Sequence, residues 1–150
     1  MCMRDIRKIL CPTDFSACSK GAIEDAVSLA RLTGAEVSIL HVYQNPAQLL
    51  PMGGYLGPVS DMLADLRKQV SAELDALAEP YRKDGPRVSV HLVEGIPYKG
   101  ILDRADEWSA DLIVMGTHGR SGVERALAGS VAERVIRLAP CPVLVSRREA

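Results

Sequence analysis

Three glycines and a serine behind an apolar run are the residues whose types and spacing point most directly to ligand chemistry. The run, residues 111–115 (DLIVM), is typical of a parallel strand buried on both faces. Gly116, Gly119 and Gly129-Ser130 follow it, and a short helix is predicted to begin at Ser130. Glycine lets the backbone approach a ligand closely, and the free N–H groups of a helix start carry roughly half a positive charge. This order of strand, glycine loop and helix start favours phosphate binding.

Ser130 and Glu133 have the spacing of a capping box, in which each side chain accepts a hydrogen bond from the backbone N–H of the other. Such a box contributes about 1 kcal/mol to helix stability. Two interpretations of Ser130 stay open: it only caps the helix, or it caps while the backbone N–H groups of Ser130 and Val131 face a phosphate. For the glycines, ordinary turn chemistry is the alternative to a ligand site.

The spacing Gly-x2-Gly-x9-Gly-Ser resembles the nucleotide-binding signature of the universal stress protein family. Residues 9–16 (ILCPTDFS) resemble the first strand of that family and its terminal aspartate, and His41-Val42 resembles the end of its second strand. Residues 140–145 (PCPVLV) resemble its closing strand. The resemblance covers essentially the whole chain, and it implies an ATP-binding, stress-responsive dimer.

Hydrophobic periodicity predicts five strands that alternate with helices, and therefore one three-layer α/β/α domain over residues 1–150 with a mostly parallel sheet. The family resemblance implies the strand order 3-2-1-4-5. Strands one and four are then neighbours at the switch point, where open α/β sheets bind ligands beyond the carboxyl ends of their strands. The predicted strands are Ile6–Pro12, Glu36–Val42, Arg87–Glu94, Asp111–Met115 and Val143–Val145.

Four helices should cover this sheet. The first is expected to begin after the N-cap Ser16 and to end at Gly34, and another to begin at Pro97. The strongest helical stripe is expected to be core throughout, and it consists of Leu63, Leu66, Val70, Leu74, Leu77 and Tyr81. The last helix should turn Val131, Val135 and Leu138 inward. His91 alternates with apolar residues and is expected at an edge or on the surface.

The resemblance assigns roles to particular residues of the expected site. Asp14 would accept hydrogen bonds from a ribose hydroxyl, with a helix-capping role beside Ser16 as the alternative. The backbone at Val42 would meet the adenine, and Arg120 would either neutralise phosphate charge or lie in solvent. Backbone amides would hold the phosphates, and they belong to Gly116, Gly119, Gly129, Ser130 and Val131. The pocket walls would be lined by Pro12, Thr13, Met115 and His118, and for His118 the alternative is a histidine that is only tolerated in the glycine loop.

The expected ligand is ATP, and Mg²⁺ could accompany it with Asp14 or phosphate oxygens as ligands. The chain has no Gly-x4-Gly-Lys-[Ser/Thr] sequence, and no acidic residue stands out as a catalytic base beside the glycine loop. A nucleotide-holding regulatory protein is therefore favoured. Two alternatives remain: a protein-interaction module with a structural glycine loop, and a slow ATPase.

Composition argues against a nucleic-acid-binding, membrane or secreted protein. With 25 % charged residues and a formal net charge of -1, the composition gives no sign of a basic surface, and nucleic acid is not expected as a partner. No apolar run approaches the about 18 residues of a membrane span, and charges at positions 4–8 interrupt any signal peptide, so a cytoplasmic protein is expected. The cysteines should be free thiols, with Cys11 and Cys141 in or near the core; a redox pair of Cys11 with Cys18 is the alternative.

Two further expectations concern flexible and exposed parts of the chain. Residues 44–59 contain three prolines and three glycines, so they are expected to be irregular, as either a lid over the cleft or a passive insertion. The last strand should lie at a sheet edge and is apolar, which is a liability unless another strand covers it. The resemblance implies an antiparallel homodimer through this edge, centred near Val143 and Val145.

Overall fold

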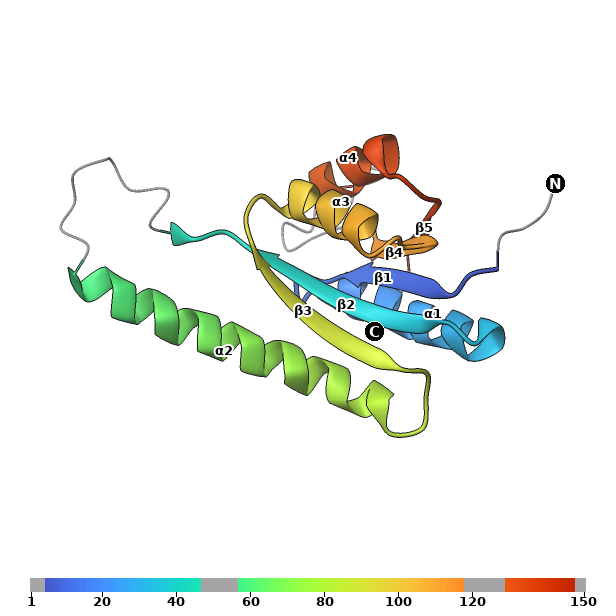
Figure 1. The fold of residues 1–150 in the computed structure, drawn as a ribbon, viewed down its shortest axis with the longest axis horizontal. Coiled ribbons are helices and arrows are strands. Elements are labelled where there is room, and N and C mark those ends of the chain that lie inside the picture. Colours follow the sequence, from blue (N-terminus) through green and yellow to red (C-terminus); the bar gives the residue numbers. More distant parts are fainter. Residues whose placement is uncertain (1–4, 47–56, 118–128, 148–150) are drawn as a thin grey trace.

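A five-stranded sheet covered by helices on both faces forms the body of the protein (Figure 1). The computed structural model describes residues 5–46, 57–117 and 129–147, with side chains omitted at 57–59. In chain order the elements are β1 (Lys8–Pro12), α1 (Ala17–Thr33), β2 (Glu36–Tyr43), α2 (Gly57–Arg82), β3 (Val88–Glu94), α3 (Pro97–Glu107), β4 (Leu112–Gly116), α4 (Ser130–Leu138) and β5 (Val143–Ser146).

The strand order is β3-β2-β1-β4-β5, and all four pairings are parallel, so the predicted fold class and strand order are confirmed. Several predicted strand ends differ by one or two residues from the observed ends, as is usual where strands fray. No helix in the described part of the chain combines the length and apolarity that a membrane crossing needs.

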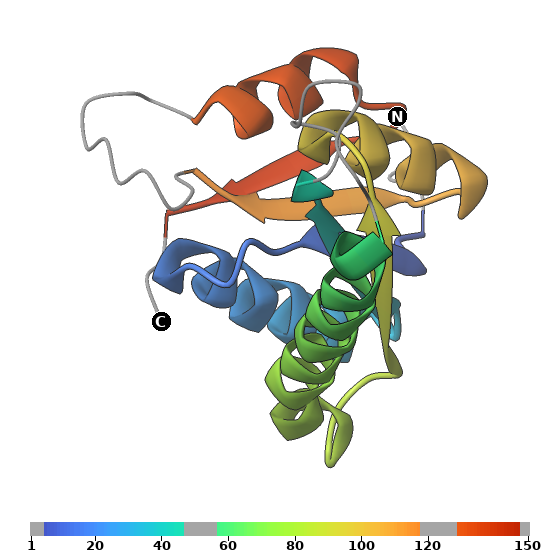
Figure 2. The same cartoon turned by 90° about the vertical axis from the view of Figure 1, so that its left-hand side faces the viewer.

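Alternation along the strands divides the core into two halves. Ile9 and Cys11 face α1 and α2, whereas Leu10, between them, faces α3 and α4. The turned view in Figure 2 shows α1 and α2 on one side of the sheet and α3 and α4 on the other. These are the three predicted layers.

The first helix is capped as predicted. The Ser19 amide donates to the Ser16 hydroxyl, and Gly34 ends the helix with a left-handed φ of 75° while its N–H bonds the Ala30 carbonyl. The helix α3 likewise begins at Pro97. The Ser16 cap therefore fixes the start of α1 a few residues after the end of β1.

The capping box predicted at the last helix is wrong. Gly129, not Ser130, is the N-cap of α4, and the Glu133 amide donates to the Gly129 carbonyl at 2.9 Å. The Glu133 carboxylate instead accepts a bond from Arg137, one turn further along the helix. Ser130 is therefore the first helical residue, and its hydroxyl is not a cap.

Two predicted core faces are also partly wrong. In α2, Leu74 is buried, but Leu66 is 36 % exposed, because the first half of the helix extends beyond the sheet (Figure 1). In α4, Leu138 is 57 % exposed, and Ala132 is buried beside Val135 instead. Periodicity identifies the apolar face of a helix, but the extent of the sheet decides how much of that face is covered.

The described cysteines are free, as expected. Cys11 and Cys18 are buried, and Cys141 is half-buried. Burial, with Asp25 as a second cause, raises the pKa of the Cys11 thiol far above its ordinary value. That thiol therefore stays protonated and behaves as a small apolar core residue. Most of the 44–59 segment, at residues 47–56, lies outside the described residues, and α2 has already begun at Gly57.

Candidate functional site

The strands β1 and β4 are hydrogen-bonded at their amino ends and separate towards their carboxyl ends. At the amino ends, the Asp111 carboxylate accepts hydrogen bonds from the amides of Arg7 and Lys8 at 3.0 and 2.9 Å. The backbone register of the two strands then covers only Ile9–Leu10 against 112–113. Beyond this point β1 stays paired with β2 and β4 stays paired with β5. A crevice therefore opens at the carboxyl ends of the two central strands, which is the switch point of the sheet.

A cavity of about 400 Å³ occupies this crevice. Its lining includes all nine predicted site residues that the structure describes, and they come from β1 and the turn after it, β2, β4 and the start of α4: Pro12, Thr13, Asp14, Val42, Met115, Gly116, Gly129, Ser130 and Val131. The other three predicted residues, His118, Gly119 and Arg120, lie outside the described residues.

Sequence reasoning missed part of the lining. Pro97 and Ile101 reach the cavity from the first two turns of α3, and His41 and Leu40 come from β2. The remaining members are Ser19, Thr117 and Ala132. Pro97 and Ile101 are one helical turn apart and follow the end of β3, so a helix start above the carboxyl end of the sheet was the available signal.

Hydroxyl groups tie the β1–α1 turn together. The Thr13 and Ser19 hydroxyl oxygens lie 2.9 Å apart, and Ser19 donates its own proton to the Ser16 carbonyl at 2.9 Å. Thr13 must therefore donate to Ser19, while its oxygen accepts from the Phe15 amide at 3.1 Å. Asp14 lies within this turn, and its Oδ1 accepts from the Ser16 amide at 3.0 Å. One of its carboxylate oxygens thus helps to shape the turn before α1, whereas the cap of that helix is Ser16.

The end of β2 presents backbone polar groups to the cavity. The Leu40 carbonyl accepts from the Thr13 amide on the β1 side, and the Tyr43 carbonyl accepts from the Gly95 amide on the β3 side. Because successive residues of a strand direct their N–H and C=O groups to opposite edges, both groups of Val42 face the β1 side. The β1–β2 register ends at Leu40, so within the described chain no strand pairs with Val42 on that side.

The start of α4 forms the opposite wall. Its first residues, Ser130, Val131 and Ala132, have no carbonyl partners inside the helix for their amides, since the ladder begins with Glu133. The Gly129 amide, which was expected to face a phosphate, instead donates to the Thr117 carbonyl. The available donors at this wall therefore begin at Ser130.

Gly116 and Gly100 are required by packing at the edges of the site. A Cβ atom on Gly116 would lie 2.7 Å from the Cys18 sulfur and 3.0 Å from the Cys18 carbonyl group. A Cβ atom on Gly100 would lie 2.8 Å from both methyl groups of Val42. Gly116 thus lets α1 pack closely on β4, which is a different reason for this glycine from the predicted approach of a phosphate.

The charges of the described lining are few. Asp14 supplies the carboxylate and His41 the imidazole, and the described lining contains no lysine or arginine. The amino ends of α4 and α3 both lie at the lining and contribute positive potential to this part of the cavity. The rest of the lining is mainly apolar, which suits a flat organic ring flanked by polar groups.

The fold and this cleft define a class: parallel α/β proteins with a cavity at the switch point of the sheet. The sequence matches the model of the universal stress protein family over residues 5–147, and the chain belongs to that family. Two relatives from Methanocaldococcus jannaschii are universal stress proteins that match almost the whole of this chain. Universal stress protein MJ0531 is 38 % identical over 95 % of this chain and 82 % of its own length. Universal stress protein MJ0577 is 32 % identical over 95 % of this chain and 96 % of its own length.

Solved structures show the same fold. That of MJ0577 superposes with a TM-score of 0.77 at 29 % identity and covers 97 % of this chain and 99 % of its own. A universal stress protein in complex with cAMP has a TM-score of 0.69 at 24 % identity, over 95 % of this chain and 97 % of its own. A universal stress protein family protein from Arabidopsis thaliana with AMP bound has a TM-score of 0.67 at 18 % sequence identity, over 96 % of this chain and 93 % of its own. Nucleotides therefore occur in proteins of this fold.

Proposed function

We propose that this protein binds an adenine nucleotide, ATP in the first place, in the cavity between β1 and β4, and that nucleotide occupancy regulates its role in a stress response. The observation that carries the proposal is the convergence of separate parts of the chain, from Pro12 to Val131, on one cavity at the switch point. The AMP and cAMP complexes of proteins with the same fold support the ligand class.

The edge of β2 suits adenine. Adenine presents a ring nitrogen acceptor, N1, beside an amino donor, N6, and these complement the N–H and C=O of Val42. Guanine in the same position would bring its O6 against the Val42 carbonyl, where two acceptors oppose each other. Apolar contacts from Leu40 and Ile101 would enclose the ring. The pocket therefore favours adenine over guanine.

The ribose and phosphates have separate partners in this proposal. The Asp14 carboxylate, which also accepts from the Ser16 amide, would accept from a ribose hydroxyl. The first amides of α4, at Ser130 and Val131, would donate to phosphate oxygens. Asp14 is the one carboxylate of the described lining, and no group of three acidic, histidine or cysteine side chains suited to a metal occurs among the described residues. Mg²⁺ would therefore depend mainly on phosphate oxygens and water.

A glycine substitution at the α4 cap tests the site. Gly129 has φ -67° and ψ 164°, an extended conformation that valine readily adopts, so Gly129→Val should fold. Its branched side chain would stand where the phosphates approach the helix. We expect calorimetry to detect no ATP binding to this variant, whereas the control Ser130→Ala keeps the backbone amides and most of the affinity. Unchanged ATP affinity in Gly129→Val would refute the site.

A regulatory role also predicts slow chemistry. Phosphoryl transfer needs a positioned nucleophile and cations that neutralise the phosphates, and the described lining contains no lysine or arginine. We therefore expect a turnover far below the range of about 1 to 1000 per second that is usual for enzymes. A steady-state assay with Mg-ATP, run beside Gly129→Val to identify contaminating ATPase, measures it. Turnover near one per second that disappears in the variant would identify an ATPase instead.

We also propose a homodimer through β5. This strand is last in the sheet order, and Leu144 on it is 39 % exposed. An exposed apolar edge strand is stabilised when a second copy extends the sheet. Val143 and Val145 would lie at the centre of such an interface.

A further inference from the structure

His41 links β2 to the turn that carries Asp14. Its Nδ1 lies 2.7 Å from the Thr13 carbonyl oxygen. A carbonyl only accepts, so Nδ1 carries a proton and donates. The last backbone bond between the two segments is that from the Thr13 amide to the Leu40 carbonyl, at 2.8 Å. The His41 side chain thus continues the pairing one step beyond the end of the backbone ladder, at the point where the chain turns into the cavity.

The turn itself has an unfavourable backbone conformation. Phe15 has a φ of 64°, in the left-handed region that costs a non-glycine residue about 1 kcal/mol or more. The His41 ring lies 4.7 Å from the Phe15 ring, centroid to centroid, at an interplanar angle of 50°. The Phe15 amide is bonded to the Thr13 hydroxyl. Such a conformation persists only where surrounding contacts determine it, and His41 contacts both residues that flank Asp14.

We propose that His41 is a positioning residue that sets the Asp14 carboxylate for the ribose hydroxyls of the bound nucleotide; this inference rests on the proposed function. Hydrogen bonds to a carboxylate tolerate only a few tenths of an ångström. When Thr13 and Phe15 are released from His41, the intervening Asp14 loses two of the contacts that fix its backbone. The base contact at Val42 and the phosphate contacts at α4 lie on other segments and do not depend on this turn.

The test compares ATP with 2′,3′-dideoxy-ATP, which lacks both ribose hydroxyls. We expect His41→Ala to weaken ATP binding about tenfold, which is the effect of losing one hydrogen bond to a charged group. The same variant should weaken dideoxy-ATP binding by less than about twofold. His41→Asn retains an N–H donor near the position of Nδ1 and should restore ATP binding to within about threefold of the wild type. His91→Ala, a histidine on β3 outside the cavity, is the matched control and should leave the ratio of the two affinities unchanged.

A double variant and a ligand-free measurement complete the test. If His41 acts through Asp14, the pair Asp14→Ala with His41→Ala binds ATP no more weakly than Asp14→Ala alone. Amide hydrogen exchange at Phe15 and Ser16 should accelerate in His41→Ala and not in His41→Asn, with no nucleotide present.

The outcomes separate this inference from the proposed function. Equal loss of both nucleotides in His41→Ala, no loss of either, additive effects with Asp14→Ala, or unchanged exchange at Phe15 would each overturn the positioning role. A wild-type protein that binds no adenine nucleotide would refute the proposed function, and the exchange measurement would still decide whether His41 fixes the conformation around Asp14. Selective loss of ATP binding in His41→Ala, together with its recovery in His41→Asn, supports the inference.

Discussion

Replacement of Gly100 by alanine tests whether α3 presses directly on the residue expected to meet the adenine. Gly100 is buried inside α3, and a Cβ atom there would lie 2.8 Å from both Val42 methyl groups and 3.4 Å from the Val42 Cβ. Carbon atoms in favourable contact are about 3.5–4.0 Å apart, so each methyl would have to move by more than half an ångström. Valine is stiff about χ1 and its methyl groups are close to the backbone, so β2 or α3 must shift.

Two terms of opposite sign set the size of the effect. Alanine in a helix interior is favoured over glycine by about 1 kcal/mol. Overpacking of a well-filled core typically costs about 1–3 kcal/mol. We therefore expect Gly100→Ala to lower the free energy of unfolding by up to about 2 kcal/mol. In a Val42→Ala background the methyl groups are absent, so the overpacking term disappears and the same change should stabilise by up to about 1 kcal/mol.

Urea unfolding of the four proteins in this cycle measures both values. A reversal of sign between the two backgrounds is the expected result. The same destabilisation in both would show that the conflict lies elsewhere in α3, and stabilisation of the wild-type background would show that Val42 accommodates the added carbon. ATP affinity of Gly100→Ala, measured in parallel, should fall, because the Val42 backbone must move with its side chain.

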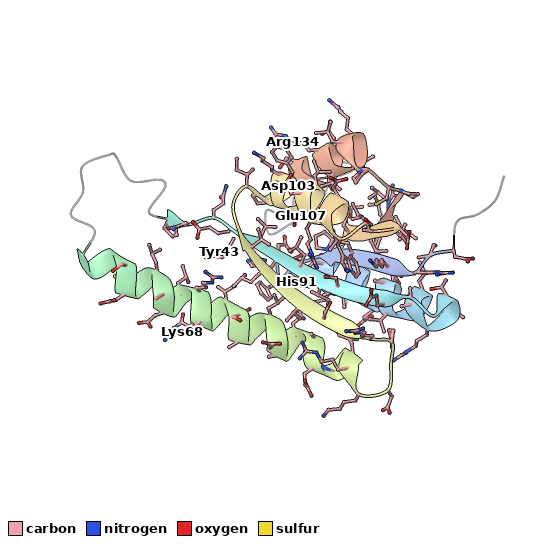
Figure 3. The ribbon with its side chains drawn as sticks, viewed as in Figure 1. Tyr43, Lys68, His91, Asp103, Glu107 and Arg134 are labelled. Atoms are coloured by element: carbon pink, nitrogen blue, oxygen red, sulfur yellow. The ribbon has the colours of Figure 1, made fainter. Side chains whose placement is uncertain are left out.

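Three other predictions concern packing, assembly and pH. Gly116→Ala should lower unfolding stability by about 1–3 kcal/mol, because its Cβ meets the Cys18 backbone as well as the sulfur; equal urea midpoints would contradict this. Light scattering of Val143→Lys should report a monomer, and a wild-type protein that is already monomeric at micromolar concentration would end the dimer proposal. Burial and the nearby Arg104 guanidinium, whose nitrogen lies 2.9 Å from Nε2, lower the pKa of His91 (Figure 3) below its ordinary value of 6.5. The unfolded chain then binds more protons, so stability should fall as the pH drops below about 6.5, and the fall should be shallower in His91→Gln; parallel pH profiles would contradict this.

Much of the fold could be predicted because its signals are local. Ser16 and Gly34 delimit α1 through side-chain and backbone preferences that act within one helical turn. Alternating and continuous apolar runs identify the strands, but periodicity contains no information about their order. The order came from the family resemblance, and the structure confirms it.

The parts that could not be predicted depend on tertiary geometry. Whether Ser130 or Gly129 caps α4 depends on where the chain leaves extended backbone, and both residues are acceptable caps. Leu66 has the periodicity of a core residue, but it is 36 % exposed in the half of α2 that extends beyond the sheet. The packing role of Gly116 depends on Cys18, a residue almost a hundred positions away along the chain.

The candidate site was predictable where residues follow directly after strands. Asp14 and Gly116 stand at the ends of β1 and β4, which the fold brings together. His41 was overlooked as a side chain because strand alternation gave no reason to direct it towards a neighbouring turn. Its bond to the Thr13 carbonyl becomes visible only when both segments are placed in space.

The short pairing of β1 with β4, which are hydrogen-bonded only near their amino ends, affects how the protein opens locally. The backbone pairing at the centre of the sheet is short, whereas the outer pairing of β2 with β3 extends from Val37 to Tyr43. Regions with few backbone bonds open at lower free energy than the rest of a protein, in units that correspond to groups of elements. We expect the unit containing β1 and β2 to separate from the unit containing β4 and β5 before either unfolds internally. A ligand held by Val42 on one side and α4 on the other would bridge the two units, so its binding free energy would add to the free energy of this opening and slow amide exchange most strongly in the middle of the sheet.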